Sequence, residues 1–293
     1  MENLEQLRRQ IQSTESLLSV VRTMKALSMT SIRQCEQAVE SLVDYYRTVR
    51  LGLQAALRQR PREVMLDGGK GARTGAVVFG AAWGMCGRFN ETLAEHAADV
   101  LQQVDHPVHV CALGDRMAGL LADAGHPPER RHAPPDGVES ITPRVQDVLV
   151  TIEQWRTGES VRRVFLFFNE TTTGTAFEPA TQQLLPLDER WLHQLEQEPW
   201  PTNQIPQFRT AWEPLFAALV RQYLFVSLYR AFAESLASEH SSRLAAMQVA
   251  QDSAEERLNT LQMRFNQRRQ SAITEELLDI TAGFEALSAE DGD

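Results

Sequence analysis

The longest uninterrupted helical signal in the chain follows Pro214. No proline occurs after this residue, and no glycine occurs between it and Gly283. Proline breaks helices and glycine weakens them, so the absence of both over this length predicts one continuous helix. At 1.5 Å per residue, roughly 70 residues would form a rod about 105 Å long. Such a rod has to bury its apolar stripe against another long element, which strongly limits the possible folds.

Residues 1–60 predict a second long helix. They contain a single glycine, Gly52, and the first proline follows at Pro61. Apolar residues recur at spacings of three and four, with Thr14 completing the pattern, at Leu4, Leu7, Ile11, Leu18 and Val21. The C-terminal helix has a similar set at Met247, Ala254, Leu258, Leu261, Phe265 and Ala272. This spacing is typical of a coiled-coil seam, so we expect the two terminal helices to pair in antiparallel orientation.

The middle of the chain, residues 75–196, has the pattern of an α/β domain between a glycine-containing linker and a proline-rich boundary. Short apolar runs alternate with helical segments, and this alternation predicts a parallel, Rossmann-like sheet. The expected order is strand 76–79, helix 89–104, strand 108–113, helix 115–124, loop 126–137, helix 141–155, strand 164–168 and a candidate edge strand 180–187. The predicted fold class is therefore α/β, with a long two-helix coiled coil formed by segments 1–60 and 212–288.

Composition and charge exclude several functions. The formal net charge of −10 argues against a general nucleic-acid binder, because such proteins present a basic surface. No stretch approaches the ~20 apolar residues that span a bilayer, and the acidic start of the chain lacks the apolar run of a signal peptide. The three cysteines are scattered and form no zinc pattern. We expect a soluble protein that reaches a membrane only through partners.

No catalytic constellation stands out in the sequence. The segment Gly84-Met85-Cys86-Gly87 lies between a strand and a helix, where α/β folds hold phosphates. It matches neither the G-x-G-x-x-G pattern nor a P-loop, so we interpret it as a tight turn. No nucleophile–base motif and no metal-ligand spacing is evident. We therefore predict no catalytic, cofactor-binding or metal-binding residues.

Three parts of the chain resemble the gamma subunits of F-type ATP synthases. The first-helix segments Leu7-Arg8-Arg9-Gln10-Ile11 and Thr23-Met24-Lys25-Ala26-Leu27-Ser28 are similar to that family, as is the central turn Gly84-Met85-Cys86-Gly87-Arg88-Phe89-Asn90. The C-terminal signature is carried by Ala237-Ser238-Glu239-His240-Ser241-Ser242-Arg243-Leu244-Ala245-Ala246-Met247 and Asn266-Gln267-Arg268-Arg269-Gln270-Ser271-Ala272-Ile273-Thr274-Glu275-Glu276-Leu277. The chain departs from the family at Ala81-Ala82-Trp83, where Ser-Asp-Arg is usual, and at Arg88, where glycine is usual. We interpret it as a divergent member.

The resemblance implies a role and a set of contacts. It implies the central rotor shaft of a rotary ATP synthase, a non-catalytic subunit that couples proton or sodium flow through the membrane c-ring to ATP synthesis or hydrolysis. Catalysis would belong to the beta subunits of the alpha/beta head. The implied partners are the alpha, beta and epsilon subunits and the c-ring, with no nucleic acid, at the cytoplasmic face of the cell membrane.

The resemblance also assigns candidate contact residues by their place in the motifs. Met24 and Lys25 would face a beta subunit, and Arg243 would lie low on the second helix. Loops of the head would touch Arg269, Gln270, Thr274 and Glu276. Two other classes remain open at this stage: a coiled-coil scaffold or adaptor that never rotates, and a nucleotide-sensing α/β enzyme with helical arms.

Overall fold

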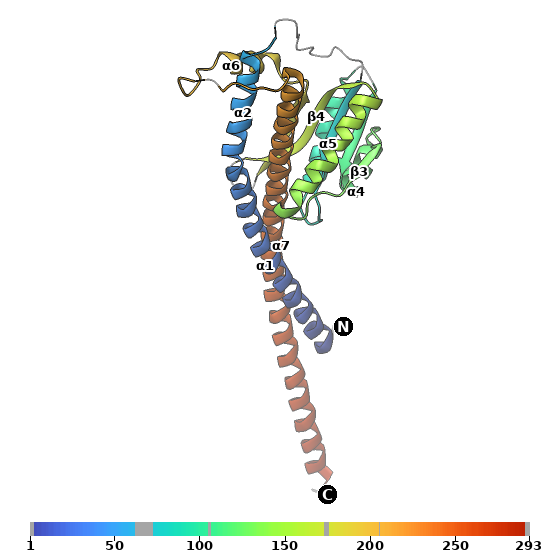
Figure 1. Ribbon diagram of the computed structural model, residues 1–293. Coiled ribbons are helices and arrows are strands. Elements are labelled where there is room, and N and C mark those ends of the chain that lie inside the picture. Colours follow the sequence, from blue (N-terminus) through green and yellow to red (C-terminus); the bar gives the residue numbers. More distant parts are fainter. Residues whose placement is uncertain (1–2, 62–72, 105–106, 173–175, 205, 291–293) are drawn as a thin grey trace. The chain divides into compact units, whose positions relative to one another are not determined.

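A computed structural model describes residues 3–61, 73–104, 107–172, 176–204 and 206–290. The chain divides into two compact units. The larger unit is Ser28–Ala245, and the smaller combines the residues up to Leu27 with those from Ala246 onward. The two long helices, α1 (Leu4–Ser41) and α7 (Trp212–Glu290), contribute to both units (Figure 1). The segments predicted from the sequence, 1–60, 75–196 and 212–288, differ from these units because they follow the ends of helices and strands.

Both predicted long helices are present, and the N-terminal one is interrupted once. The C-terminal helix α7 is continuous over 79 residues, with Pro214 in its first turn, where a missing N–H costs no helical hydrogen bond. At Leu42 the backbone N–H donates to the carbonyl of Val39 (3.1 Å), which ends α1. A separate helix, α2 (Val43–Arg58), then continues the segment. Within α2, a Cβ at Gly52 would come within 2.8 Å of Leu219, so this glycine permits close approach of α2 to α7.

The central sheet has five strands in the order β3-β2-β1-β4-β5. Four of them are parallel, and β5 pairs with β4 in antiparallel orientation. The strands are β1 (Arg73–Phe79), β2 (Val108–Leu113), β3 (Arg130–His132), β4 (Val161–Thr171) and β5 (Phe177–Leu185). The connecting helices are α3 (Phe89–Gln102), α4 (Asp115–Asp123), the 3₁₀ helix η1 (Val138–Ser140) and α5 (Ile141–Gly158). This parallel order is that of a Rossmann-like sheet, as predicted.

Two elements differ from the sequence-based expectation. The segment 126–137, expected to be a loop, contains β3, which pairs with β2 through three residues at the sheet edge. Arg130, Arg131 and His132 give no apolar signal, because an edge strand this short buries little. A further helix, α6 (Glu189–Gln197), was not predicted; Asp188 caps it by accepting a hydrogen bond from the N–H of Arg190 (2.9 Å). Of the predicted linker 61–74, residues 62–72 lie outside the described part.

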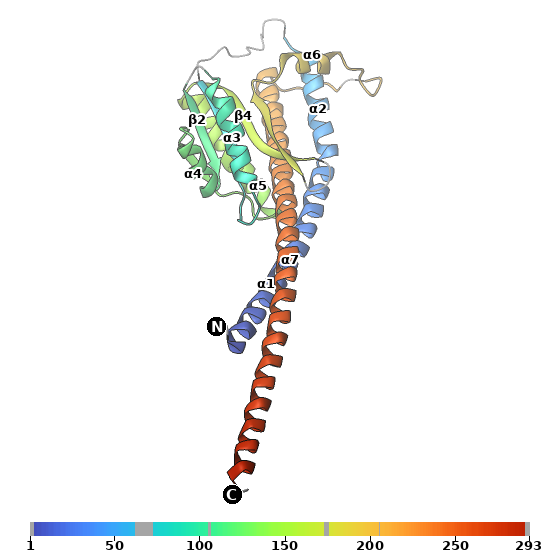
Figure 2. The same ribbon diagram turned by 180° about the vertical axis from the view of Figure 1, so that it is seen from behind.

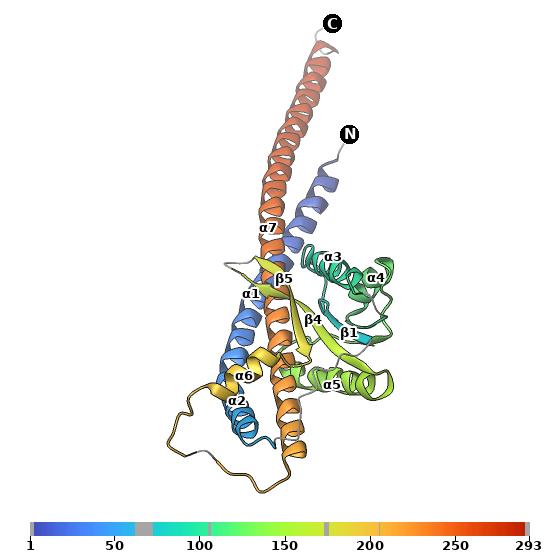
Figure 3. The same cartoon turned by 90° about the horizontal axis from the view of Figure 1, so that it is seen from above.

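Apolar side chains cover both faces of the sheet. Helices α3 and α4 lie on one face (Figure 2). Their side chains pack against Ala76, Val78 and Val110. Helices α5 and α7 lie on the opposite face (Figure 3). There, α5 and residues 224–237 of α7 pack against the alternate side chains of β1, β2 and β4. The rings of Phe79 and Phe232 lie 4.6 Å apart at their centroids. This stretch of α7 is therefore part of the core of the larger unit.

In the smaller unit, the start of α1 and the later part of α7 pair in antiparallel orientation, as predicted. Arg22 forms an ion pair with Glu255 (3.0 Å), and the Lys25 ammonium lies 3.4 Å from the side-chain oxygen of Gln251. The buried residues fall on the predicted seam: Leu7, Thr14, Leu18, Val21, Met247, Ala254 and Leu261. Beyond this pairing, α7 continues with exposed apolar side chains at Ile273, Leu277, Leu278 and Ile280.

Candidate functional site

The loop between β1 and α3, residues 80–88, contains the predicted tight turn. Met85 and Gly87 have φ angles of 60° and 58°, and this left-handed conformation is uncommon for a residue with a bulky side chain such as Met85. The side chains of Trp83 and Met85 are 65% and 63% exposed, so they do not anchor the loop in the larger unit. The loop is held instead by the buried side chain of Cys86 and by bonds to its backbone.

Glu239 of α7 binds the backbone of this loop. One carboxylate oxygen accepts a hydrogen bond from the N–H of Ala82 (2.9 Å), and the other accepts from the N–H of Trp83 (3.3 Å). The same carboxylate forms an ion pair with Arg243, one helical turn further along α7. The Glu239 and Arg243 side chains are only 3% and 5% exposed. A charged pair this deeply buried is stable only when further hydrogen bonds satisfy both groups.

Arg243 supplies the complementary contacts to the same loop. Its guanidinium donates to the carbonyl oxygens of Trp83 (3.1 Å) and Gly84 (3.3 Å). The neighbouring Ser242 hydroxyl donates to the carbonyl of Cys86 (2.6 Å). Arg243 was expected among the contacts to a partner head, but the structure places its guanidinium inside the chain. Its described contacts therefore assign it a positioning role for the β1–α3 loop.

His240 lies beside this ion pair and is neutral at physiological pH. Burial and the adjacent Arg243 charge lower the pKa of His240 to about 4. Its Nδ1 lies 3.2 Å from the Arg243 guanidinium, which is a donor, so Nδ1 acts as the acceptor. A neutral imidazole adds no second positive charge to the buried pair.

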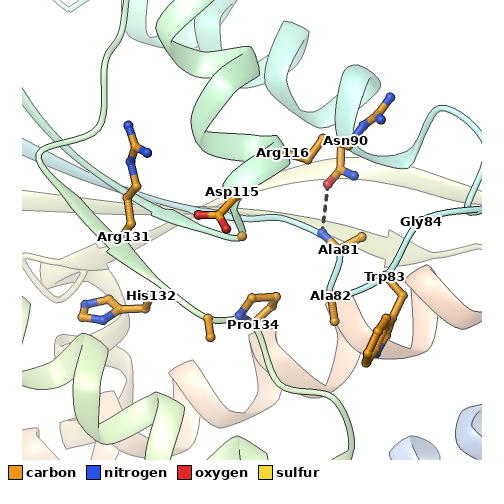
Figure 4. Close-up of a pocket in the computed structure, with 12 residues that line it drawn as sticks. Ala81, Ala82, Trp83, Gly84, Asn90, Asp115, Arg116, Arg131, His132 and Pro134 are labelled. Carbon is orange, nitrogen blue, oxygen red and sulfur yellow. Dashed lines mark hydrogen bonds between the residues drawn. The ribbon is translucent and has the colours of Figure 1, made fainter.

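A cavity of about 360 Å³ adjoins the loop at the carboxyl ends of β1, β2 and β3. Figure 4 shows Asp115, Arg131 and His132 around it, with the side-chain oxygen of Asn90 bonded to the N–H of Ala81 (2.8 Å). Arg116, which also lines it, is paired with Glu91. Its lining thus combines both signs of charge and lacks a nucleotide-binding glycine pattern. In the described residues, no group of His, Cys, Asp and Glu is arranged to hold a metal ion.

The other predicted contact residues lie in the smaller unit, in two separate places. Met24 and Lys25 are half-buried on α1, and Lys25 also donates to Gln248. Further along α7, the side chains of Arg269, Gln270, Thr274 and Glu276 are exposed. The Thr274 hydroxyl donates to the carbonyl of Gln270 (2.9 Å), a bond within the helix.

Sequence reasoning missed the exposed apolar side chains that accompany these polar ones. These apolar side chains are Ile273, Leu277 and Ile280. With about 100° of rotation per residue, they project from one side of α7, between Arg269 on one flank and Gln270 and Thr274 on the other. It also missed Glu239, although Glu239 and Arg243 have the four-residue spacing of a helical ion pair. Among the described residues, no helix has both the length and the apolar content needed to cross a membrane.

Comparison with known proteins identifies the family. The ATP synthase family model matches residues 3–287, which include the α/β unit and nearly all of both long helices. The chain belongs to this family. The relatives that it matches almost end to end are ATP synthase gamma chains. That of Nitrosospira multiformis is 25% identical, with 96% of this chain and 98% of that protein covered. That of a Cyanothece species is 28% identical, with 98% and 100% covered.

Solved structures show the same fold at lower identity. The rotor of the Euglena gracilis mitochondrial ATP synthase aligns with a TM-score of 0.60 at 17% identity, over 92% of this chain and 98% of that one. A chain in the OSCP/F1/c-ring structure of the same synthase aligns with a TM-score of 0.62 at 19% identity, over 99% and 96%. Identity this low fits a divergent family member.

Proposed function

We propose that this chain is the gamma subunit of a rotary ATP synthase, the central shaft that couples ion flow through a c-ring to ATP synthesis or hydrolysis. The observation that carries this proposal is the single family match over residues 3–287, which joins both long helices to the α/β unit. Catalysis belongs to the beta subunits of the head, and this chain contributes no reacting group.

The long helices suit the transmission of torque. A rotor shaft has to resist bending, and α7 continues for 79 residues with no proline beyond its first turn. Residues 224–237 of the same helix are packed against the sheet, so force applied to the α/β unit reaches α7 through a close-packed core. In the smaller unit, α7 is supported by the antiparallel start of α1.

The exposed end of α7 is the proposed contact with the alpha/beta head. It presents apolar side chains at Ile273, Leu277 and Ile280, which the described part of the chain leaves exposed. Arg269, Gln270, Thr274 and Glu276 provide hydrogen-bonding groups around them, and Met24 and Lys25 are proposed to face a beta subunit. An apolar centre with a polar surround is the usual composition of a protein interface.

The α/β unit is proposed to meet the epsilon subunit and the c-ring. This arrangement makes the chain a peripheral protein at the cytoplasmic face of the cell membrane, held there through partners. The transported ion, proton or sodium, is selected in the c-ring.

Affinity purification of the tagged chain from its own cells tests this proposal. A rotor shaft co-purifies with alpha, beta and c subunits, and the complex hydrolyses ATP whereas the isolated chain does not. Recovery with unrelated partners and without alpha and beta subunits would support a coiled-coil scaffold instead. ATP hydrolysis by the pure chain would support the enzyme interpretation.

A further inference from the structure

The sheet has a topological switch point between β1 and β4. Strands β2 and β3 lie on one side of β1, whereas β4 and β5 lie on its other side. In open α/β sheets, ligands bind outside the carboxyl ends of the strands at such a point. Phosphates there accept hydrogen bonds from backbone N–H groups of the loop that follows the first strand. A segment of the chain that contacts the carboxyl ends of both strands, or the loops that follow them, therefore occupies the usual ligand position.

In this chain, α7 contacts the end of β4 and the loop after β1. The Ser238 hydroxyl lies 2.9 Å from that of Thr171 at the end of β4. The next residue, Glu239, accepts hydrogen bonds from two consecutive N–H groups after β1, those of Ala82 and Trp83. Two consecutive N–H groups that converge on one anion resemble the backbone anion sites of phosphate-binding loops.

We propose that residues 80–84 form an oxyanion-binding turn whose anion is the carboxylate of Glu239. This internal ligand fills the switch point and fastens the β1–α3 loop to α7. Arg243 balances the carboxylate charge and binds the carbonyl groups of Trp83 and Gly84, so one buried ion pair satisfies both donors and acceptors of the loop. This contact would act as a lock between the α/β unit and the shaft, and that mechanical role rests on the proposed function.

This arrangement also accounts for the divergent sequence of the loop. Within this loop, the hydrogen bonds of Glu239, Arg243 and Ser242 reach backbone atoms, those of residues 82, 83, 84 and 86. The side chains at Ala82, Trp83 and Met85 can therefore vary without loss of these bonds. Replacement of the usual Ser-Asp-Arg of the family by Ala81-Ala82-Trp83 is compatible with an unchanged lock.

Hydrogen exchange of the full chain tests the site. In Glu239→Ala, we expect the amides of Ala82 and Trp83 to exchange at least about tenfold faster, the change that loss of a charge-assisted hydrogen bond implies. Sodium formate supplies a free carboxylate of the right size. It should restore the slow exchange and the melting temperature in a saturable way, whereas sodium chloride at the same ionic strength should not.

Two further variants provide the controls. Glu234→Ala removes the acid of another Arg–Glu pair on α7, that with Arg230 (2.6 Å), and should show no rescue by formate. Glu239→Gln replaces one carboxylate oxygen by an NH2 group, which cannot accept, so it should accelerate exchange of at least one of the two amides. Because it keeps the side-chain volume, formate should not restore the slow exchange. It also serves as the test if Glu239→Ala does not fold.

Unchanged exchange at Ala82 and Trp83 in both Glu239 variants would overturn the proposal. Equal stabilisation of Glu239→Ala and Glu234→Ala by formate would also overturn it, because it would show a general salt effect. These measurements use the chain without its partners, so their failure leaves the rotor assignment standing. Conversely, a failed co-purification with alpha and beta subunits would leave the oxyanion turn intact.

Discussion

Gly80 lies where β1 ends against β2, and its backbone N–H donates to the carbonyl of Leu113 (2.9 Å). A Cβ built at this position would lie 2.3 Å from the same carbonyl oxygen and 2.6 Å from the Cβ of Met117. Neither neighbour is the free end of a flexible side chain, so the clash can be relieved only by a shift of the backbone. Gly84, in the same loop, has no atom within 4 Å of such a Cβ.

These two glycines form a matched pair for mutation. We expect Gly80→Ala to destabilise the chain by about 1–3 kcal/mol, the usual effect of overpacking a close contact. Gly84→Ala should leave the melting temperature nearly unchanged, because its side chain would enter open space. Thermal unfolding followed by circular dichroism measures both. Equal melting temperatures for the two variants would show that the β1–β2 contact is looser than described.

Arg269 tests the proposed contact with the head at the residue scale. If its exposed guanidinium meets the head at a solvated edge, Arg269→Ala should weaken binding to the alpha/beta hexamer by ~1 kcal/mol or less. If it meets a desolvated loop, the loss should be ~2–5 kcal/mol. Arg264→Ala is the control, because Arg264 projects about 140° away around the helix. An affinity unchanged by Arg269→Ala would remove this residue from the contact set.

Among the helices and strands, the sequence predicts those that carry a long or strongly apolar signal. The structure confirms the predictions of the two long helices, of strand 108–113 and of the first residue of α5. These predictions succeed because periodicity and apolar runs reflect burial directly. The short β3 and helix α6 escape prediction because their stability comes from an edge pairing and from packing of Leu192 and Leu195 against α2. The interruption at Leu42 lies in a sequence without proline or glycine, so no local signal marks it.

The candidate site shows the same limit. The motif around 84–90 predicts a turn, and the turn is present. That Glu239 should be its bonding partner could not be predicted, because 157 residues separate Glu239 from Ala82 and the contact depends on how α7 packs on the sheet. The family resemblance includes Arg243 in the C-terminal signature, but only the structure shows what its guanidinium binds.

Ala254 tests the role of α7 as a mechanical element. It is buried on the seam with α1 in the smaller unit. Proline there would remove a backbone hydrogen bond and kink the helix at a cost of ~3 kcal/mol or more. We expect an assembled Ala254→Pro complex to hydrolyse ATP but to transport fewer ions per ATP in membrane vesicles.

The control for this variant is Ala254→Gly, which costs ~1 kcal/mol of helix stability without a kink. Its ratio of ion transport to ATP hydrolysis should stay close to that of the unmodified complex. An assembled Ala254→Pro complex with an unchanged ratio would show that this part of α7 carries no torque.

At the scale of the whole molecule, the proposed role as a rotor shaft requires the chain to turn as a body relative to the head. Its cysteines allow this to be observed directly. Cys35, Cys86 and Cys111 are all buried, and burial raises the pKa of Cys35 and Cys111 to about 12, so they react poorly with thiol reagents. A new cysteine at the exposed Asp99 of α3 therefore provides a selective attachment point.

The most direct test is single-molecule rotation of the complex that contains Asp99→Cys. The alpha/beta head is fixed to a surface, a bead is attached to the new cysteine, and ATP is added. If the chain is the rotor shaft, we expect continuous rotation of the bead in one direction, which stops when ATP is removed. Beads that show only Brownian motion on complexes that hydrolyse ATP would contradict it.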